Sequence, residues 1–282
     1  SWVKTHPMET PSNQAVAYHR SQHILKKVAT DAKLVEIFKE YTERDFIEKT
    51  SLQQLKTQRN ASFAPWHAVY KETSSNTKVR VVFDCSCKTR LTGLSLNDFL
   101  WKGPNLTNDL VKILLRFRLH NVAFVADIEK AFLAINIRAQ DRPFLRFYFL
   151  DDFSKPDGRL AVYHFKVNIF GSRASTFILA AVLYHHFSKH RYQVTNDMME
   201  NILVDNVVSG ARDVTHAEQY YKESRTVLNA AAMNLCQWTS NTPRINALAH
   251  EEGVDGPSTV HVPVPYTHPN LPTNRTVSPS GL

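Results

Sequence analysis

The fold of this chain is decided by one stretch, Val122-Ala-Phe-Val-Ala-Asp-Ile-Glu-Lys-Ala-Phe132. Residues 122–126 are small, β-branched or aromatic, a run that predicts a buried strand with Asp127 at its end. A carboxylate at the end of such a strand has few rotamers to lose. This suits a hard cation, which needs oxygen ligands at fixed positions. Aspartate is also a common cap of a turn or helix, so Asp127 by itself leaves both interpretations open.

A second acid lies in another apolar run, Asn201-Ile-Leu-Val-Asp-Asn-Val-Val-Ser-Gly210. Apolar residues on both sides of Asp205 and Asn206 predict a hairpin with this polar pair at its tip. The two strands could bring Asp127 and Asp205 around one pair of divalent ions about 3.5–4 Å apart, which suits phosphoryl or nucleotidyl transfer. Asp-Asn is also an ordinary turn sequence, and the alternative is a turn without chemistry.

The composition favours a polyanionic partner. The 282 residues have a net charge of +8, 43% hydrophobic residues and a pI of about 9.3. A basic surface of this kind is typical of nucleic-acid-binding proteins, although it needs no partner to exist. Three cysteines without a secretory signal indicate a reducing compartment. No stretch is long and apolar enough to span a bilayer, so we expect no membrane association. The chain does not start with methionine, so we expect a fragment of a longer protein.

Changes in composition predict three parts. Residues 1–60 are polar with one apolar helical stripe, and predict a helical N-terminal connector. Residues 61–241 mix strands and helices and predict the main α+β domain. Residues 242–282 contain seven of the thirteen prolines and few large apolar side chains, so we expect a disordered tail.

Within the main domain, two features could meet a phosphate. Strands are predicted over 63–71 and 78–84, and their hairpin presents Lys71 and Arg80. Phe170 and Gly171 precede a helix predicted over 176–190, where a ligand could approach the backbone closely. Taken alone, an exposed basic surface explains the hairpin better than a phosphate site does, and the loop before the helix is a weak signal. Other predicted elements are a helix capped by Thr107, strands over 144–150 and 160–167, a helix capped by Asp213, and a last strand over 233–238.

A series of short motifs in a fixed order resembles the polymerase segment of Pao-type (Bel/Pao) LTR retrotransposons. The motifs are His67-Ala-Val-Tyr-Lys71, Arg80-Val-Val-Phe-Asp84, Ser95-Leu-Asn-Asp98, Gly103-Pro-Asn-Leu106, Leu114-Leu-Arg-Phe-Arg118, Ala126-Asp-Ile-Glu-Lys-Ala-Phe132, Asp141-Arg142, Leu145-Arg-Phe147 and Val204-Asp-Asn206. The resemblance covers about residues 61–241. It implies the palm and fingers of a reverse transcriptase, preceded by the helical connector and followed by no recognisable thumb.

The resemblance also implies an activity and roles for single residues. The activity is RNA-directed DNA polymerisation, with an RNA or DNA template-primer, deoxynucleoside triphosphates and other segments of a retroelement polyprotein as partners, in a cytoplasmic particle or the nucleus. Asp127 and Asp205 would bind Mg²⁺ or Mn²⁺, with Asn206 beside them in the catalytic centre. The nucleotide would be bound by Arg80, Lys71, Phe132, Phe170 and Gly171. Among these, the Phe132 ring would exclude a ribose 2′-hydroxyl.

The chain departs from the family pattern at the second acid. Reverse transcriptases usually have a tyrosine, any residue and two aspartates there, whereas this chain has Leu203-Val-Asp-Asn206. Thr176 stands where the family commonly has proline. A neutral amide attracts a divalent ion less than a carboxylate does. Two alternatives to an active polymerase fragment therefore remain open. The first is a catalytically dead relic that keeps only the fold and a basic nucleic-acid-binding surface. The second is a basic α+β scaffold without a nucleotide site.

Overall fold

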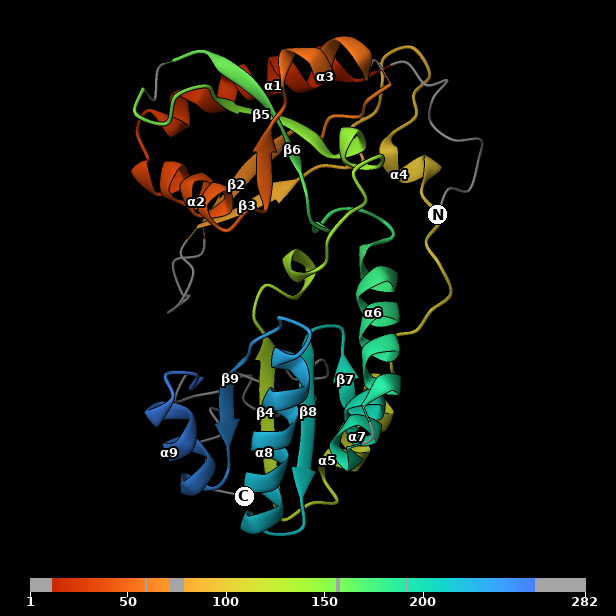
Figure 1. Cartoon of the computed structure of the whole chain (residues 1–282), viewed down its shortest axis with the longest axis vertical. Helices are drawn as coiled ribbons and strands as arrows, with labels where there is room; N and C mark the ends of the chain where they lie inside the picture. Colours follow the sequence, from red (N-terminus) through yellow and green to blue (C-terminus); the bar gives the residue numbers. More distant parts are fainter. Residues whose placement is uncertain (1–11, 59, 71–78, 156–157, 191, 257–282) are drawn as a thin grey trace, which may run out of the picture. The chain divides into compact units, whose positions relative to one another are not determined.

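A computed structural model describes residues 12–58, 60–70, 79–155, 158–190 and 192–256 (Figure 1). The chain forms two compact units. The first unit comprises residues 1–105 and 132–178, and the second comprises 106–131 and 179–282. Both contain helices packed on antiparallel strands, so the predicted α+β class is confirmed.

The first unit holds a three-stranded and a two-stranded sheet. Its helices are α1 (Gln14–Val28), α2 (Ala32–Glu43), α3 (Leu52–Thr57) and α4 (Leu96–Phe99). Its strands are β1 (Ile47–Lys49), β2 (Trp66–Tyr70), β3 (Val79–Phe83), β5 (Arg146–Leu150) and β6 (Leu160–Phe165), in the orders β1-β6-β5 and β2-β3. The apolar stripe of α2 supplies the centre of the core: Phe38 is fully buried, with its ring centroid 3.8 Å from that of Phe149 and 4.9 Å from that of Trp66.

The second unit is built on a four-stranded antiparallel sheet in the order β7-β8-β4-β9 (Figure 1). Its strands are β4 (Val122–Ile128), β7 (Ile202–Leu203), β8 (Asn206–Ala211) and β9 (Leu235–Ser240), and its helices are α5 (Leu110–Phe117), α7 (Gln193–Asn201), α8 (Val214–Asn229) and α9 (Pro243–Glu251). Helix α6 (Ser175–Lys189) contributes residues to both units. Phe124 on β4 packs against Tyr220 of α8 and Trp238 of β9, which places the core on one face of the sheet.

Several predicted elements form close to their expected bounds. The helix predicted over 176–190 is α6, and Asp213 caps α8 by accepting a hydrogen bond from the His216 amide. The cap of α5 differs from the expectation: Asp109, and not Thr107, accepts hydrogen bonds from the Val111 and Lys112 amides. Asp109 is the cap because it lies next to the first helical residue, and from there its side-chain oxygen reaches the unpaired backbone amides of the first turn.

The predicted disordered tail needs one correction. Residues 14–57, within the predicted helical connector, include α1–α3 and the short strand β1, and their contacts place them in the same unit as residues 61–105. The predicted disorder from residue 242 does not hold for α9, whose Ile245 and Ala249 are fully buried. Two buried apolar side chains on one helical face stabilise α9 against its neighbours β9 and α8, a long-range effect that local proline content does not reveal.

Candidate functional site

Strand β4 places Asp127 on the face of the sheet that lies opposite the core. Burial alternates along β4: residues 122, 124, 126 and 128 are buried, and 123, 125 and 127 are half-buried. Side chains alternate between the two faces of a strand. Phe124 points to the core, so Asp127 points away from it, as a ligand-binding carboxylate must.

The β7–β8 hairpin brings Asp205 next to Asp127, although the two are far apart in the sequence. Strand β8 pairs directly with β4, with Asn206 opposite Asp127. The Ile128 amide donates a hydrogen bond of 2.8 Å to the carbonyl oxygen of Asp205. The two predicted metal-binding acids are therefore neighbours at the same end of the sheet, one on a strand and one on a turn.

The tip of this hairpin is one residue earlier than predicted. Leu203 pairs with Asn206, so the two-residue turn is Val204-Asp205, and Asn206 is already part of β8. Val204 has a φ of 62°, in the left-handed region that β-branched residues avoid. Local preferences could not predict this turn, because valine is a poor choice for a residue with positive φ. Strained residues of this kind are concentrated at functional sites.

Asp205 is half-buried and hydrogen-bonded to its neighbour. Asn206 Nδ2 donates to Asp205 Oδ1 at 3.0 Å. Burial raises the pKa of the Asp205 carboxyl, and hydrogen bonds from its own amide and from Asn206 oppose this in part. A raised pKa means that protons compete with a cation for this carboxylate at a higher pH than for an exposed aspartate.

Sequence reasoning missed Cys236, which lies opposite Asp127 on the other side of β4. Strand β9 contains an extra residue between the pairs Val125–Thr239 and Asp127–Cys236, and Gln237 there has a φ of 55°. This bulge turns Cys236 to the face of Asp127. Burial, then the negative charges of Asp127 and Glu129, raise the pKa of the Cys236 thiol to about 11. No local pattern in Leu235–Ser240 signals the bulge.

The donor set fits a weakly coordinated divalent ion. Within the described residues, no group of three or more histidine, cysteine, aspartate or glutamate side chains is arranged to hold a metal. The two acids can supply carboxylate oxygens, and the exposed Asn206 offers an amide oxygen. Mg²⁺ is commonly held by one or two carboxylates, with water and substrate phosphates completing the octahedron. Asp127, Asp205 and Asn206 thus offer oxygen ligands of the kind that such an ion uses.

Four of the predicted nucleotide-binding residues, Arg80, Phe132, Phe170 and Gly171, belong to the first unit. Arg80 is exposed on β3, opposite Val69 of β2, and Lys71 lies outside the described residues. Phe132 is only 2% exposed, whereas Phe170 is 61% exposed, and their ring centroids are 4.0 Å apart. The structure thus brings Phe132 and Phe170 together, with Phe170 as the accessible ring. It also places them in a different unit from Asp127 and Asp205.

Gly171 has a conformation and a setting that only glycine fits. Its φ is 96°, and a Cβ atom added there would lie 2.3 Å from the Phe83 carbonyl oxygen. Asn97 Nδ2 donates to the Gly171 carbonyl at 2.9 Å, and Asn97 Oδ1 accepts from the Arg173 amide at 2.8 Å. Sequence reasoning used Asn97 only as part of the Ser95–Asp98 motif and gave it no role at the site.

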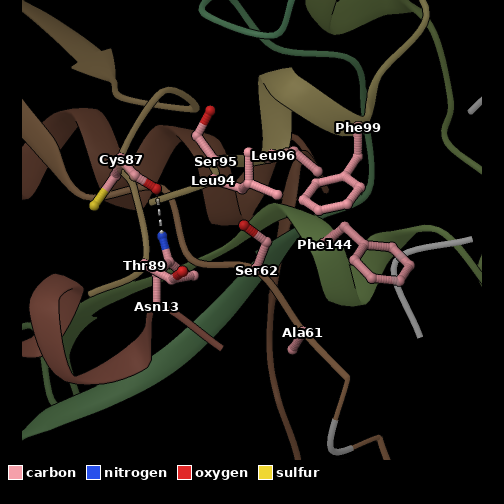
Figure 2. Close-up of a pocket in the computed structure, with 10 residues that line it drawn as sticks. All are labelled: Asn13, Ala61, Ser62, Cys87, Thr89, Leu94, Ser95, Leu96, Phe99 and Phe144. Atoms are coloured by element: carbon pink, nitrogen blue, oxygen red, sulfur yellow. Dashed lines mark hydrogen bonds between the residues drawn. The ribbon is translucent and has the colours of Figure 1, made fainter. Parts of the chain in front are cut away.

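A small cavity in the first unit is distinct from these residues (Figure 2). It is lined by Asn13, Ala61, Ser62, Cys87, Thr89, Leu94, Ser95, Leu96, Phe99 and Phe144. Asn13 Nδ2 donates to the Cys87 carbonyl at 3.1 Å across it. The cavity volume of about 20 Å³ leaves room for water but not for a nucleotide.

The chain matches none of the protein-family models and none of the curated proteins with which it was compared. Among the helices of the described residues, none has the length and hydropathy of a membrane span.

Proposed function

We propose that this chain is the palm-and-fingers part of an RNA-directed DNA polymerase from a Pao-type LTR retrotransposon. The observation that best supports the proposal is the adjacency of Asp127 and Asp205 at one end of a single antiparallel sheet. The motif series predicted that these two acids, from distant parts of the chain, would act together. The net charge of +8 agrees with a nucleic-acid substrate.

In this proposal, Asp127 and Asp205 would hold the Mg²⁺ or Mn²⁺ ions, with water and substrate phosphates as the remaining ligands. Such ions would supply activation of the primer 3′-hydroxyl and neutralisation of charge on the departing pyrophosphate. Asp127 acts from a strand whose backbone is fixed by pairing on both sides, so its carboxylate is positioned in advance. Arg80 offers a planar, always charged guanidinium to the triphosphate.

A second candidate function is nucleic-acid binding without chemistry, as expected of a degenerate copy. The observation that favours it is the hydrogen bond from Asn206 to Asp205. The amide engages a carboxylate oxygen that a cation would use, and it contributes no charge of its own. Leu203, which precedes the turn, also leaves the hairpin without the aromatic residue that is usual in reverse transcriptases.

Primer extension on an RNA template with Mg²⁺ or Mn²⁺ tests the proposal, with Asp127→Ala and Asn206→Asp measured in parallel. We expect the native chain to extend the primer. The extension rate of Asp127→Ala should be lower by about 10³-fold or more, because one metal-binding carboxylate is removed. We expect Asn206→Asp to extend faster than the native chain, because a second charge attracts the cation.

The outcomes separate the two candidates. Extension only by Asn206→Asp indicates a folded polymerase disabled at its metal site, which is the second candidate. Equal extension by the native chain and Asp127→Ala would contradict the site assignment. If no variant extends a primer, while all bind the template-primer equally, the nucleic-acid-binding relic is the better description.

A further inference from the structure

Helix α5 of the second unit turns an apolar face to the solvent. Ile113 is its only buried residue. Leu119, just after the helix, is exposed as well. Four apolar side chains of the helix are between 42% and 64% exposed: Leu110, Val111, Leu114 and Leu115. Single exposed apolar side chains are ordinary, but a contiguous group on one element is typical of a protein-binding surface.

The exposed side chains of α5 form two parallel ridges. Residues four positions apart in an α-helix lie one above the other on the same side of it. Leu110 and Leu114 therefore form one ridge, and Val111 and Leu115 form the next. The groove between two such ridges accepts a ridge of side chains from another helix, which is the commonest way for helices to pack. The face thus has the form of one half of a helix–helix contact.

Two cations border these ridges. Arg118 continues the first ridge by one more turn, and Lys112 lies beside the second ridge. Both are exposed, and within the described residues neither forms an ion pair. Arg116, in contrast, is occupied, because its Nε atom donates a hydrogen bond of 2.8 Å to Asn201 Oδ1. Lys112 and Arg118 are therefore available to acidic groups of a partner.

We infer that α5 is a docking surface for an amphipathic helix of another protein, with leucine-type side chains on one face and aspartate or glutamate along the borders of that face. The apolar side chains of the partner fill the groove between the two ridges, and its acids pair with Lys112 and Arg118. The inference is independent of the proposed polymerase activity, since it uses neither Asp127 nor Asp205.

Charge distinguishes this occupant from two others. A second copy of the chain would bring two sets of the same cations into one interface, and like charges oppose association. The only acid in residues 109–119, Asp109, already accepts hydrogen bonds from two amides of α5. Residues 257–282 of the chain itself contain apolar side chains but no aspartate or glutamate. Only an acidic helix complements both the ridges and the cations.

The test is equilibrium binding of two labelled synthetic peptides to the full chain, measured by fluorescence anisotropy. The first is an alanine-based helix with leucines in two neighbouring i, i+4 rows and glutamates along both borders. The second has lysines in place of the glutamates. We expect the glutamate peptide to bind, and the lysine peptide to bind weaker by about tenfold or more, because its charges repel those of α5.

Two variants of α5 test the apolar and the charged contacts separately. The double variant Leu114→Ala and Leu115→Ala should weaken binding of the glutamate peptide by about tenfold or more, since two apolar contacts are cut back while the helix is kept. Lys112→Glu should weaken binding of the glutamate peptide by about two- to fivefold and strengthen binding of the lysine peptide.

Leu91→Ala is the matched control. Leu91 is also an exposed leucine, at 84%, but it lies in a turn of the first unit. We expect no change in peptide binding, and the thermal unfolding midpoint of each variant shows that it is folded. No binding of the glutamate peptide by the native chain, equal binding of both peptides, or unchanged binding by the double variant would overturn the inference.

Two further measurements show whether a different occupant takes this face. Sedimentation equilibrium should find the native chain monomeric; a dimer that the double variant does not form would overturn the inference in favour of a second copy. Vesicles of anionic lipid should bind the native chain and the double variant equally. Vesicle binding that is lost only in the double variant would overturn the inference in favour of a lipid surface.

Discussion

At the scale of single residues, His164 is the group whose surroundings predict a pH effect on stability. It is 4% exposed on β6, between Glu48 of β1 and Arg146 of β5, and its Nδ1 atom lies 3.0 Å from Thr50 Oγ1. Burial lowers the pKa of His164, the charges of Arg146 and Arg142 lower it further, and Glu48 opposes them. The native protein thus keeps this imidazole neutral to a lower pH than the unfolded chain does.

The sign of the effect follows from proton linkage. As the pH falls below the ordinary histidine pKa of about 6.5, the unfolded chain takes up a proton that folded His164 does not. The free energy of unfolding therefore decreases toward acid pH. The free energy of unfolding, measured with urea from about pH 8 to pH 5, should decrease less for His164→Gln than for the native chain. Equal slopes for the two proteins would mean that His164 makes no contribution.

At the scale of elements, the β7–β8 hairpin combines good strand pairing with a strained turn. Val204 has a φ of 62°, a conformation that costs a β-branched residue about 1–2 kcal/mol. Glycine adopts it freely but loses more backbone entropy on folding, about 0.5–1 kcal/mol. We therefore expect Val204→Gly to raise the free energy of unfolding by roughly 0.5–1 kcal/mol, measured by urea denaturation.

Val208→Gly, four residues further along the same hairpin, is the control. Val208 lies in the middle of β8 opposite Val125, where glycine loses strand propensity and packing without relieving strain. This variant should be less stable than the native chain. If both variants lose stability equally, Val204 is not a strained residue in solution.

At the scale of the whole molecule, the net charge of +8 predicts salt-sensitive binding to nucleic acid. A protein that contacts six to ten phosphates loses roughly 10³- to 10⁵-fold in affinity between about 50 and 200 mM salt. We expect the affinity of the native chain for an RNA–DNA template-primer to fall steeply in this range, measured without divalent ions.

Arg80→Gln refines this prediction, because Arg80 is exposed on β3. If Arg80 contacts a phosphate, the slope of log affinity against log salt should decrease by about 1. Asp127→Ala removes a negative charge at the proposed metal site and no cation, so it should not flatten the slope. An affinity independent of salt would contradict a nucleic-acid role for the basic surface.

Local sequence patterns by themselves predicted many of the elements and singled out Asp127 and Asp205. The apolar run that ends at Asp127 predicted β4, and Asp213 predicted the start of α8, because strand alternation and helix capping depend on residues within a few positions. The tertiary structure alone decided the rest. The bulge at Gln237 turned Cys236 toward Asp127, buried contacts made α9 a helix in a proline-rich region, and Asn97 reached residues more than seventy positions away. These features depend on strand register and on the closing of long loops, and local periodicity contains no information about either.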